Sequence, residues 1–169
     1  QVAAAVGLDA ATAGLIAVEQ QAQASAESVD VATESMLGSN ADAMTALLEH
    51  CPTAVTDVTG FGLIGHLLEM LDANNKRLVA RLDLVAIPLL PGALELAASG
   101  WRSSLYTQLE PYLARCDIDP KPQASKTGVN RSAAIELLLD PQTSGGLLAT
   151  LAQDDAERLM QQSSQFVCI

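Results

Sequence analysis

TDVTGFGLIGHLLEM, residues 56–70, is the stretch around which the rest of the chain is organised. Together with the two preceding residues it gives a short apolar run, Ala54–Val58, which is typical of a strand and carries Asp57 near its end. A tight turn with two glycines follows at 59–62. The residues after the turn place apolar side chains three and four positions apart, which predicts a helix with one buried face. The stretch therefore predicts a strand–turn–helix unit with an acidic residue at its junction.

This junction has the chemistry of a metal–phosphate site. Backbone N–H groups at the start of a helix favour an anion, and glycines let that anion approach the backbone closely. Asp57 would repel a phosphate at the same place unless a divalent cation lay between them. Mg2+ fits that position, because it prefers one or two carboxylates together with phosphate oxygens. Two plainer interpretations stay open: the glycines serve close packing of the helix on a sheet, and Asp57 or Thr59 caps the helix.

The composition is that of one folded domain that does not bind nucleic acid. The chain has 169 residues, of which 49% are hydrophobic, 17% charged and only 3% aromatic, so aliphatic side chains must build the core. Its net charge of -11 provides no basic patch for nucleic acid or for an anionic membrane. No apolar run is long enough to span a bilayer. Cys51, Cys116 and Cys168 form no Cys-x-x-Cys pair, which argues against zinc and thioredoxin-type sites and favours a reducing cytoplasm.

The remaining sequence predicts an α+β fold with mixed layers of helices and strands. Alternating apolar residues over Leu78–Ala86 predict a half-exposed strand, and Leu147–Ala152 predicts a buried strand. Asn40 is expected to cap a helix whose apolar stripe ends in a buried Cys51, and Asp154 to cap the last helix. Other helices are expected over Val29–Leu37, which Gly38 ends, over Ala93–Ser99 and over Tyr106–Arg115.

A second motif, DPQTSGG at 140–146, has a weaker functional case. Its Asp, Pro and Gly residues are explained by a turn between two strands, with Asp140 and Ser144 as the side chains that could reach a site. His66 and Glu69 are predicted to lie off the buried stripe of their helix and without a metal-binding partner. Arg102 is more typical of a solvent-facing residue than of a phosphate ligand.

Two motifs occur in this order along the chain, first TDVTGFGLIGHLLEM and then LDPQTSGGLL (139–148). Together they closely resemble the C-terminal domain of the selenophosphate synthetase family (selenide, water dikinase). MLGSN (36–40) lies ahead of them and PLLPGALELA (88–97) lies between them, as in that family. The family belongs to the aminoimidazole ribonucleotide synthetase-related superfamily. The resemblance therefore implies a sheet packed with helices, as in the C-terminal domains of that superfamily.

The resemblance also implies an activity and a site. Family members use ATP, selenide and water to make selenophosphate, AMP and phosphate, with Mg2+ as cofactor, and work as homodimers in the cytoplasm. It implies that Asp57 is a metal ligand and that Thr59, Gly60 and Gly62 form the cofactor-binding turn that faces the phosphates. ATP is bound mainly by the family's N-terminal domain.

The sequence departs from the family pattern near its ends. Residues 1–28 match weakly and are interpreted as a connector or docking helix, with a helical stretch at Ala10–Ala24. Residues 29–169 are interpreted as the C-terminal domain, with its last strand, which begins at Phe166, cut short. The ATP-binding half is absent, so we expect a fragment that is inactive alone and binds ATP poorly.

Two other functions stay open. The chain could be a non-catalytic dimerisation or regulatory module, which a start codon near residue 1 would favour, whereas an in-frame ATP-binding half upstream would favour the enzyme. A phosphotransferase acting on a purine precursor is the third possibility, and Phe61 and the DPQTSGG motif weigh against it.

Overall fold

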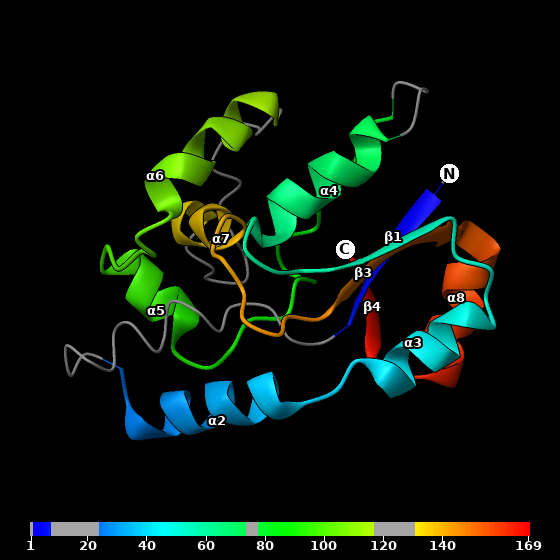
Figure 1. The fold of residues 1–169 in the computed structure, drawn as a ribbon, viewed down its shortest axis with the longest axis horizontal. Coiled ribbons are helices and arrows are strands. Elements are labelled where there is room, and N and C mark those ends of the chain that lie inside the picture. The colour runs from blue at the N-terminus through cyan, green and yellow to red at the C-terminus, as the bar shows by residue number, and fades with distance from the viewer. Residues whose placement is uncertain (1, 8–23, 74–77, 117–130) are drawn as a thin grey trace.

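The computed structural model describes residues 2–7, 24–73, 78–116 and 131–169, and Figure 1 shows their arrangement. The helices and strands follow one another in the order β1 (Val2–Gly7), α2 (Ala26–Leu37), α3 (Ala41–Leu48), β2 (Ala54–Asp57), α4 (Gly62–Asp72), α5 (Ala93–Ala98), α6 (Tyr106–Leu109), the 3-10 helix η1 (Glu110–Arg115), α7 (Arg131–Leu137), β3 (Leu147–Ala152), α8 (Gln153–Gln162) and β4 (Phe166–Cys168).

The four described strands form one antiparallel sheet in the order β2-β3-β1-β4. β2 is an edge strand, and its register places Asp57 opposite Leu147 at the start of β3. The first strand lies inside the sheet, where Val2 pairs with Ala152 and Val6 with Val167. Segments from both ends of the chain therefore meet in the sheet that carries Asp57.

Helices cover both faces of the sheet. Alternate residues of β3, Leu147 and Leu151 among them, pack with buried side chains of α3 and α8. Leu148 points to the opposite face and packs with the buried side of α4. Figure 1 shows α3 and α8 together on one side of the sheet and α4 on the other. Because β3 is buried on both faces, its sequence LLATLA is almost continuously apolar. The predicted α+β fold with mixed layers is confirmed.

The predicted strand–turn–helix unit is also confirmed. β2 ends at Asp57, and α4 begins at Gly62. The helix buries Leu63, Ile64, Leu67 and Leu68 in the core. Each such side chain contributes about 1.5–3 kcal/mol when it leaves water. The apolar stripe thus fixes α4 against the sheet and orients the turn that precedes it.

The other helices predicted within the described residues are present, and two of them begin earlier than expected. α2 begins at Ala26 rather than Val29, because the hydroxyl of Ser25 accepts a hydrogen bond from the Ser28 amide at 3.1 Å. The last helix begins at Gln153 with Ala152 in the capping position, so Asp154 lies in the first turn, where a carboxylate favours the helix dipole. The strand expected at the C-terminal end is β4.

The prediction that Cys51 is buried in the core was wrong. α3 ends at Leu48, and Cys51 has a left-handed backbone with φ of 50° and an exposed side chain. The helical spacing that placed Cys51 on the apolar stripe does not extend past the end of the helix. His50 is buried instead, and its Nε2 lies 2.9 Å from the side-chain oxygen of Gln162.

The strand predicted over Leu78–Ala86 is absent; these residues form an irregular segment that ends in a turn. The Asp83 carboxylate accepts a hydrogen bond from the Val85 amide at 3.0 Å, which is typical of an Asx turn. Leu82 and Leu84 pack at the edge of the core. Alternation alone was misleading, because a strand also needs a neighbour with which to pair.

The interpretation of residues 1–28 as a connector or docking helix missed β1. VAAAVG has little alternation and is rich in alanine, which has a weak strand preference, so only pairing with β3 and β4 makes this segment a strand. The helix expected over Ala10–Ala24 falls almost wholly outside the described residues. Within the ranges that the structure describes, no helix has both the length and the apolar character needed to cross a membrane.

Candidate functional site

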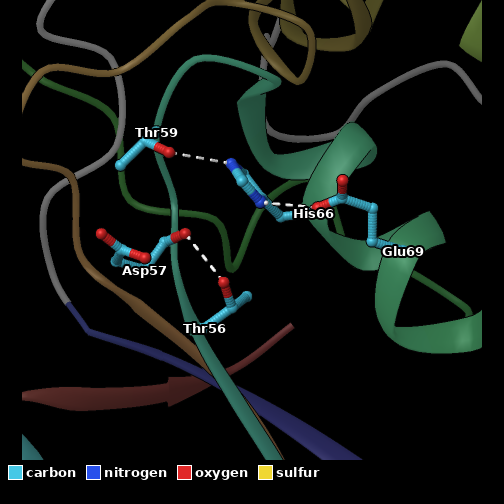
Figure 2. Close-up of polar contacts among 5 residues, drawn as sticks. All are labelled: Thr56, Asp57, Thr59, His66 and Glu69. Atoms are coloured by element: carbon cyan, nitrogen blue, oxygen red, sulfur yellow. Dashed lines mark hydrogen bonds and ion pairs between the residues drawn. The ribbon is translucent and has the colours of Figure 1, made fainter. Parts of the chain in front are cut away.

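Asp57 lies at the end of the edge strand β2, with an exposed side chain. Its backbone carbonyl accepts a hydrogen bond from the Thr56 hydroxyl at 3.2 Å (Figure 2). Among the described residues no cationic side chain forms an ion pair with the Asp57 carboxylate. The carboxylate is therefore accessible to a cation from solvent.

The turn after Asp57 is held by its own backbone and by the second motif. The Thr59 carbonyl accepts hydrogen bonds from the amides of Gly62, at 3.0 Å, and Gln142, at 2.9 Å. The Val58 amide donates to the Gly146 carbonyl at 2.9 Å. DPQTSGG thus forms one wall of the site next to the turn.

DPQTSGG connects helix α7 to strand β3, so the prediction of a turn between two strands was wrong. Asp140 and Gln142 are buried, which a solvent-facing hairpin turn would not require. At Gly145 a Cβ atom would lie only 2.2 Å from the Val58 carbonyl oxygen. The motif is conformationally demanding because it packs directly on the residues that follow Asp57.

The two glycines of the turn differ in their surroundings. Gly62 is buried with φ of +65°, and an added Cβ would meet the Leu138 carbonyl oxygen at 2.8 Å. The amides of Gly62 and Ile64 donate to the carbonyls of Thr59 and Leu138, so both donors are used within the protein. Gly60 is exposed, with nothing within 4 Å of an added Cβ. Gly60 is thus the glycine with open space beside its backbone.

His66 was predicted to lie off the buried stripe, and this was wrong. Figure 2 shows its imidazole between the hydroxyl of Thr59 and the carboxylate of Glu69. Nε2 lies 3.1 Å from Thr59 Oγ1, and Nδ1 lies 3.1 Å from Glu69 Oε2. The ring is buried because the rest of the fold covers a wider face of α4 than the one formed by its leucines. The His–Glu spacing of one helical turn was the only sequence signal for this arrangement.

The Arg102 guanidinium is engaged by other groups of the protein. It pairs with Glu136 at 2.6 Å, donates to the Gly100 carbonyl at 2.9 Å and lies over the Tyr106 ring at 5.3 Å. The hydrogen bond to Glu136 is the main reason why the pKa of Arg102 is raised. These side chains line a small hollow that also touches Asp140. The interpretation of Arg102 as other than a phosphate ligand agrees with these contacts.

The residues around Asp57 fit a cation that takes most of its ligands from other groups, such as water and substrate phosphates. In the part of the chain that the structure describes, no group of three or more His, Cys, Asp or Glu side chains could hold a metal ion. A single accessible carboxylate suits Mg2+, which usually keeps several waters and binds through one or two carboxylates and substrate phosphates. Among the described residues, the Asp57 carboxylate could hold such an ion.

The chain is similar to known proteins over a stretch that includes both motifs. Residues 5–168 match the family described as "AIR synthase related protein, C-terminal domain". The chain is 40% identical over 146 residues to "Selenide, water dikinase" of Trichlorobacter lovleyi, covering 85% of this chain and 36% of that protein. It is 35% identical over 134 residues to the protein of the same name from Geobacter sp. strain M21, covering 79% and 36%.

A third relative, "Selenide, water dikinase" of Pseudomonas aeruginosa, is 36% identical over 141 residues, which cover 83% of this chain and 37% of that protein. The chain thus spans little more than a third of the length of these relatives. The resemblance inferred from the two motifs is confirmed. Together with the family match over nearly the whole chain, the fold and the paired motifs lead to one conclusion: the chain belongs to the family of AIR synthase related protein C-terminal domains.

Proposed function

We propose that this chain is the C-terminal domain of a selenophosphate synthetase, which converts ATP, selenide and water to selenophosphate, AMP and phosphate. The names of the relatives support this assignment. The observation that carries the site assignment is the accessible Asp57 carboxylate beside two mutually packed motifs. We further propose that the complete protein is a cytoplasmic homodimer, and that this chain without an ATP-binding domain is inactive.

The proposed role of Asp57 is to bind Mg2+ that is shared with the phosphates of ATP. The cation would neutralise charge on the transferring phosphoryl group. A chain with a net charge of -11 needs such a cation next to a polyphosphate. The turn would hold the carboxylate in place, because its Thr59 carbonyl is fixed by two hydrogen bonds. Thr59, Gly60 and Gly62 stay the proposed phosphate-facing residues, with Gly60 the most open of the three.

The test is AMP formation from ATP and selenide by the full-length protein that carries this chain. Asp57→Asn keeps the shape of the side chain and removes its charge, so turnover should fall by about 100-fold or more, since a metal clamp supplies several kcal/mol. Asp83→Asn is the matched control, because Asp83 is an exposed carboxylate outside the site. Turnover of Asp57→Asn close to that of the control would reject the ligand assignment.

A further inference from the structure

His66 is a buried side chain with a partner on each ring nitrogen, and the proposed function gives it no role. Its Nδ1 faces Glu69 Oε2, and its Nε2 faces Thr59 Oγ1, both at 3.1 Å. The Phe61 ring lies against it with centroids 5.6 Å apart. The outer end of the chain of contacts is open to solvent, since the Glu69 side chain is 59% exposed. The inner end is the turn that follows Asp57.

The partners determine where the proton of a neutral imidazole lies. An ionised carboxylate can only accept hydrogen bonds, so Nδ1 must donate to Glu69. In a neutral ring Nε2 then carries no proton and acts as an acceptor. The Thr59 hydroxyl is the donor to Nε2, because it is the only one of these two groups that still has a proton to give. The hydroxyl oxygen keeps its lone pairs for a further partner.

We propose that His66 and Glu69 are positioning residues that fix the Thr59 hydroxyl with its lone pairs available to a cation or to water bound on that cation. This rests on the proposed function, in which Asp57, two residues before Thr59, binds Mg2+. A bare phosphate oxygen is itself an acceptor, so a hydroxyl whose proton is given to His66 does not stabilise it. The Thr59 hydroxyl therefore serves the metal side of the site, which leaves the backbone of the turn to face the phosphates.

The fold makes this arrangement rigid. His66 lies on α4 between buried residues, including Leu67, that pack in the core. The backbone of Thr59 is held separately by Gly62 and Gln142. Both ends of the Thr59–His66 contact are thus fixed by different parts of the fold, and Glu69 has only to select the tautomer.

The tautomer can be measured in the 169-residue chain, which contains only two histidines. Long-range proton–nitrogen NMR spectra distinguish a protonated from an unprotonated ring nitrogen. When the ring carries a single proton, we expect that proton on Nδ1, which faces Glu69. Glu69→Ala should move the proton toward Nε2, while Glu34→Ala, at an exposed helical glutamate of α2, should leave it unchanged. A proton on Nε2 in the unmodified chain overturns the proposal.

The positioning role is tested by the Mg2+ dependence of the full-length protein. Glu69→Ala and Thr59→Val should each raise the half-saturating Mg2+ concentration by about tenfold, the usual cost of losing an outer-shell partner. Thr59→Ser, which restores the hydroxyl, should bring it back near the original value, and Glu34→Ala should not change it.

The two proposals fail in different ways. An unchanged Mg2+ dependence in Glu69→Ala, with a damaged Asp57→Asn enzyme, overturns the positioning role and leaves the proposed function standing. An increase in the half-saturating ATP concentration alone would also overturn it. An Asp57→Asn enzyme with normal turnover rejects the proposed function itself and with it the assignment of Thr59 to a metal.

Discussion

The side-chain amide of Asn40 donates a hydrogen bond of 2.9 Å to the carbonyl oxygen of Gly145, which is 105 residues further along the chain. This contact joins the start of helix α3 to the DPQTSGG motif. The following residue, Gly146, in turn accepts a hydrogen bond from Val58 beside Asp57. Three segments that are distant in sequence therefore form one continuous support for the candidate metal ligand.

Asn40→Asp should destabilise the protein by about 1–3 kcal/mol, because a carboxylate cannot donate to the Gly145 carbonyl and leaves it without that partner. Asp is as good a helix cap as Asn, so capping is unchanged by this substitution. The urea midpoint followed by circular dichroism gives the change in unfolding free energy. An unchanged midpoint would mean that Asn40 acts as a cap, as the sequence suggested, although its side chain makes no capping hydrogen bond.

Substitution by alanine should change the unfolding free energy much more at one glycine of the turn than at the other. Gly62→Ala should cost at least about 2 kcal/mol, because the left-handed backbone and the nearby Leu138 carbonyl both oppose a Cβ atom. Gly60→Ala should change the unfolding free energy by less than ~1 kcal/mol, because the space beside it is open. Thermal unfolding of the two variants side by side makes the comparison, and equal losses would contradict it.

Leu47 and Leu48 are neighbours on α3 with opposite surroundings, at 0% and 58% exposure. Leu47→Ala should lower the unfolding free energy by about 2–5 kcal/mol, since it leaves a cavity between α3 and the sheet. Leu48→Ala should change it by no more than about 0.5 kcal/mol. Chemical denaturation measures both values. A large loss of unfolding free energy in Leu48→Ala would contradict the exposure of this leucine.

Cys116 should react more slowly with thiol reagents than the two exposed cysteines, Cys51 and Cys168. Burial raises the pKa of the Cys116 thiol, only partly offset by the positive charge of Arg115. A raised pKa leaves less of the reactive thiolate at neutral pH, and the difference should narrow as the pH increases. Alkylation with iodoacetamide, followed by mass spectrometry of each cysteine peptide, gives the three rates. Equal rates at pH 7 would contradict this expectation.

Local sequence patterns predicted those elements whose burial follows their own periodicity. The stripe of α4, the run of β3 and the helix before Gly38 each bury a face that can be identified from a dozen residues or fewer. The site residue Asp57 could be identified in the same way, since it stands at a strand end before a glycine turn. Its predicted role as a metal ligand stays a prediction.

The errors have a common physical origin in contacts between distant segments. β1 is a strand only because β3 and β4 pair with it, and 78–86 is not a strand because no described strand lies beside it. The burial of His66 and the tie between Asn40 and Gly145 likewise depend on partners that no local window contains. Periodicity predicts which face is apolar, but it does not identify the segment that will cover that face.

The inner place of β1 in the sheet has a consequence for how the chain acquires its fold. Val2 pairs with Ala152, and Gly7 pairs with Phe166, so β1 is synthesised well before either of its neighbours in the sheet. Pairings across such sequence separations are slow to form, because the entropy of closing a long loop is lost before any contact stabilises the pair. Until β3 is synthesised, β2 and Asp57 at its end have no strand to pair with among those described. The platform under the candidate metal ligand is therefore completed only after β4 has been synthesised.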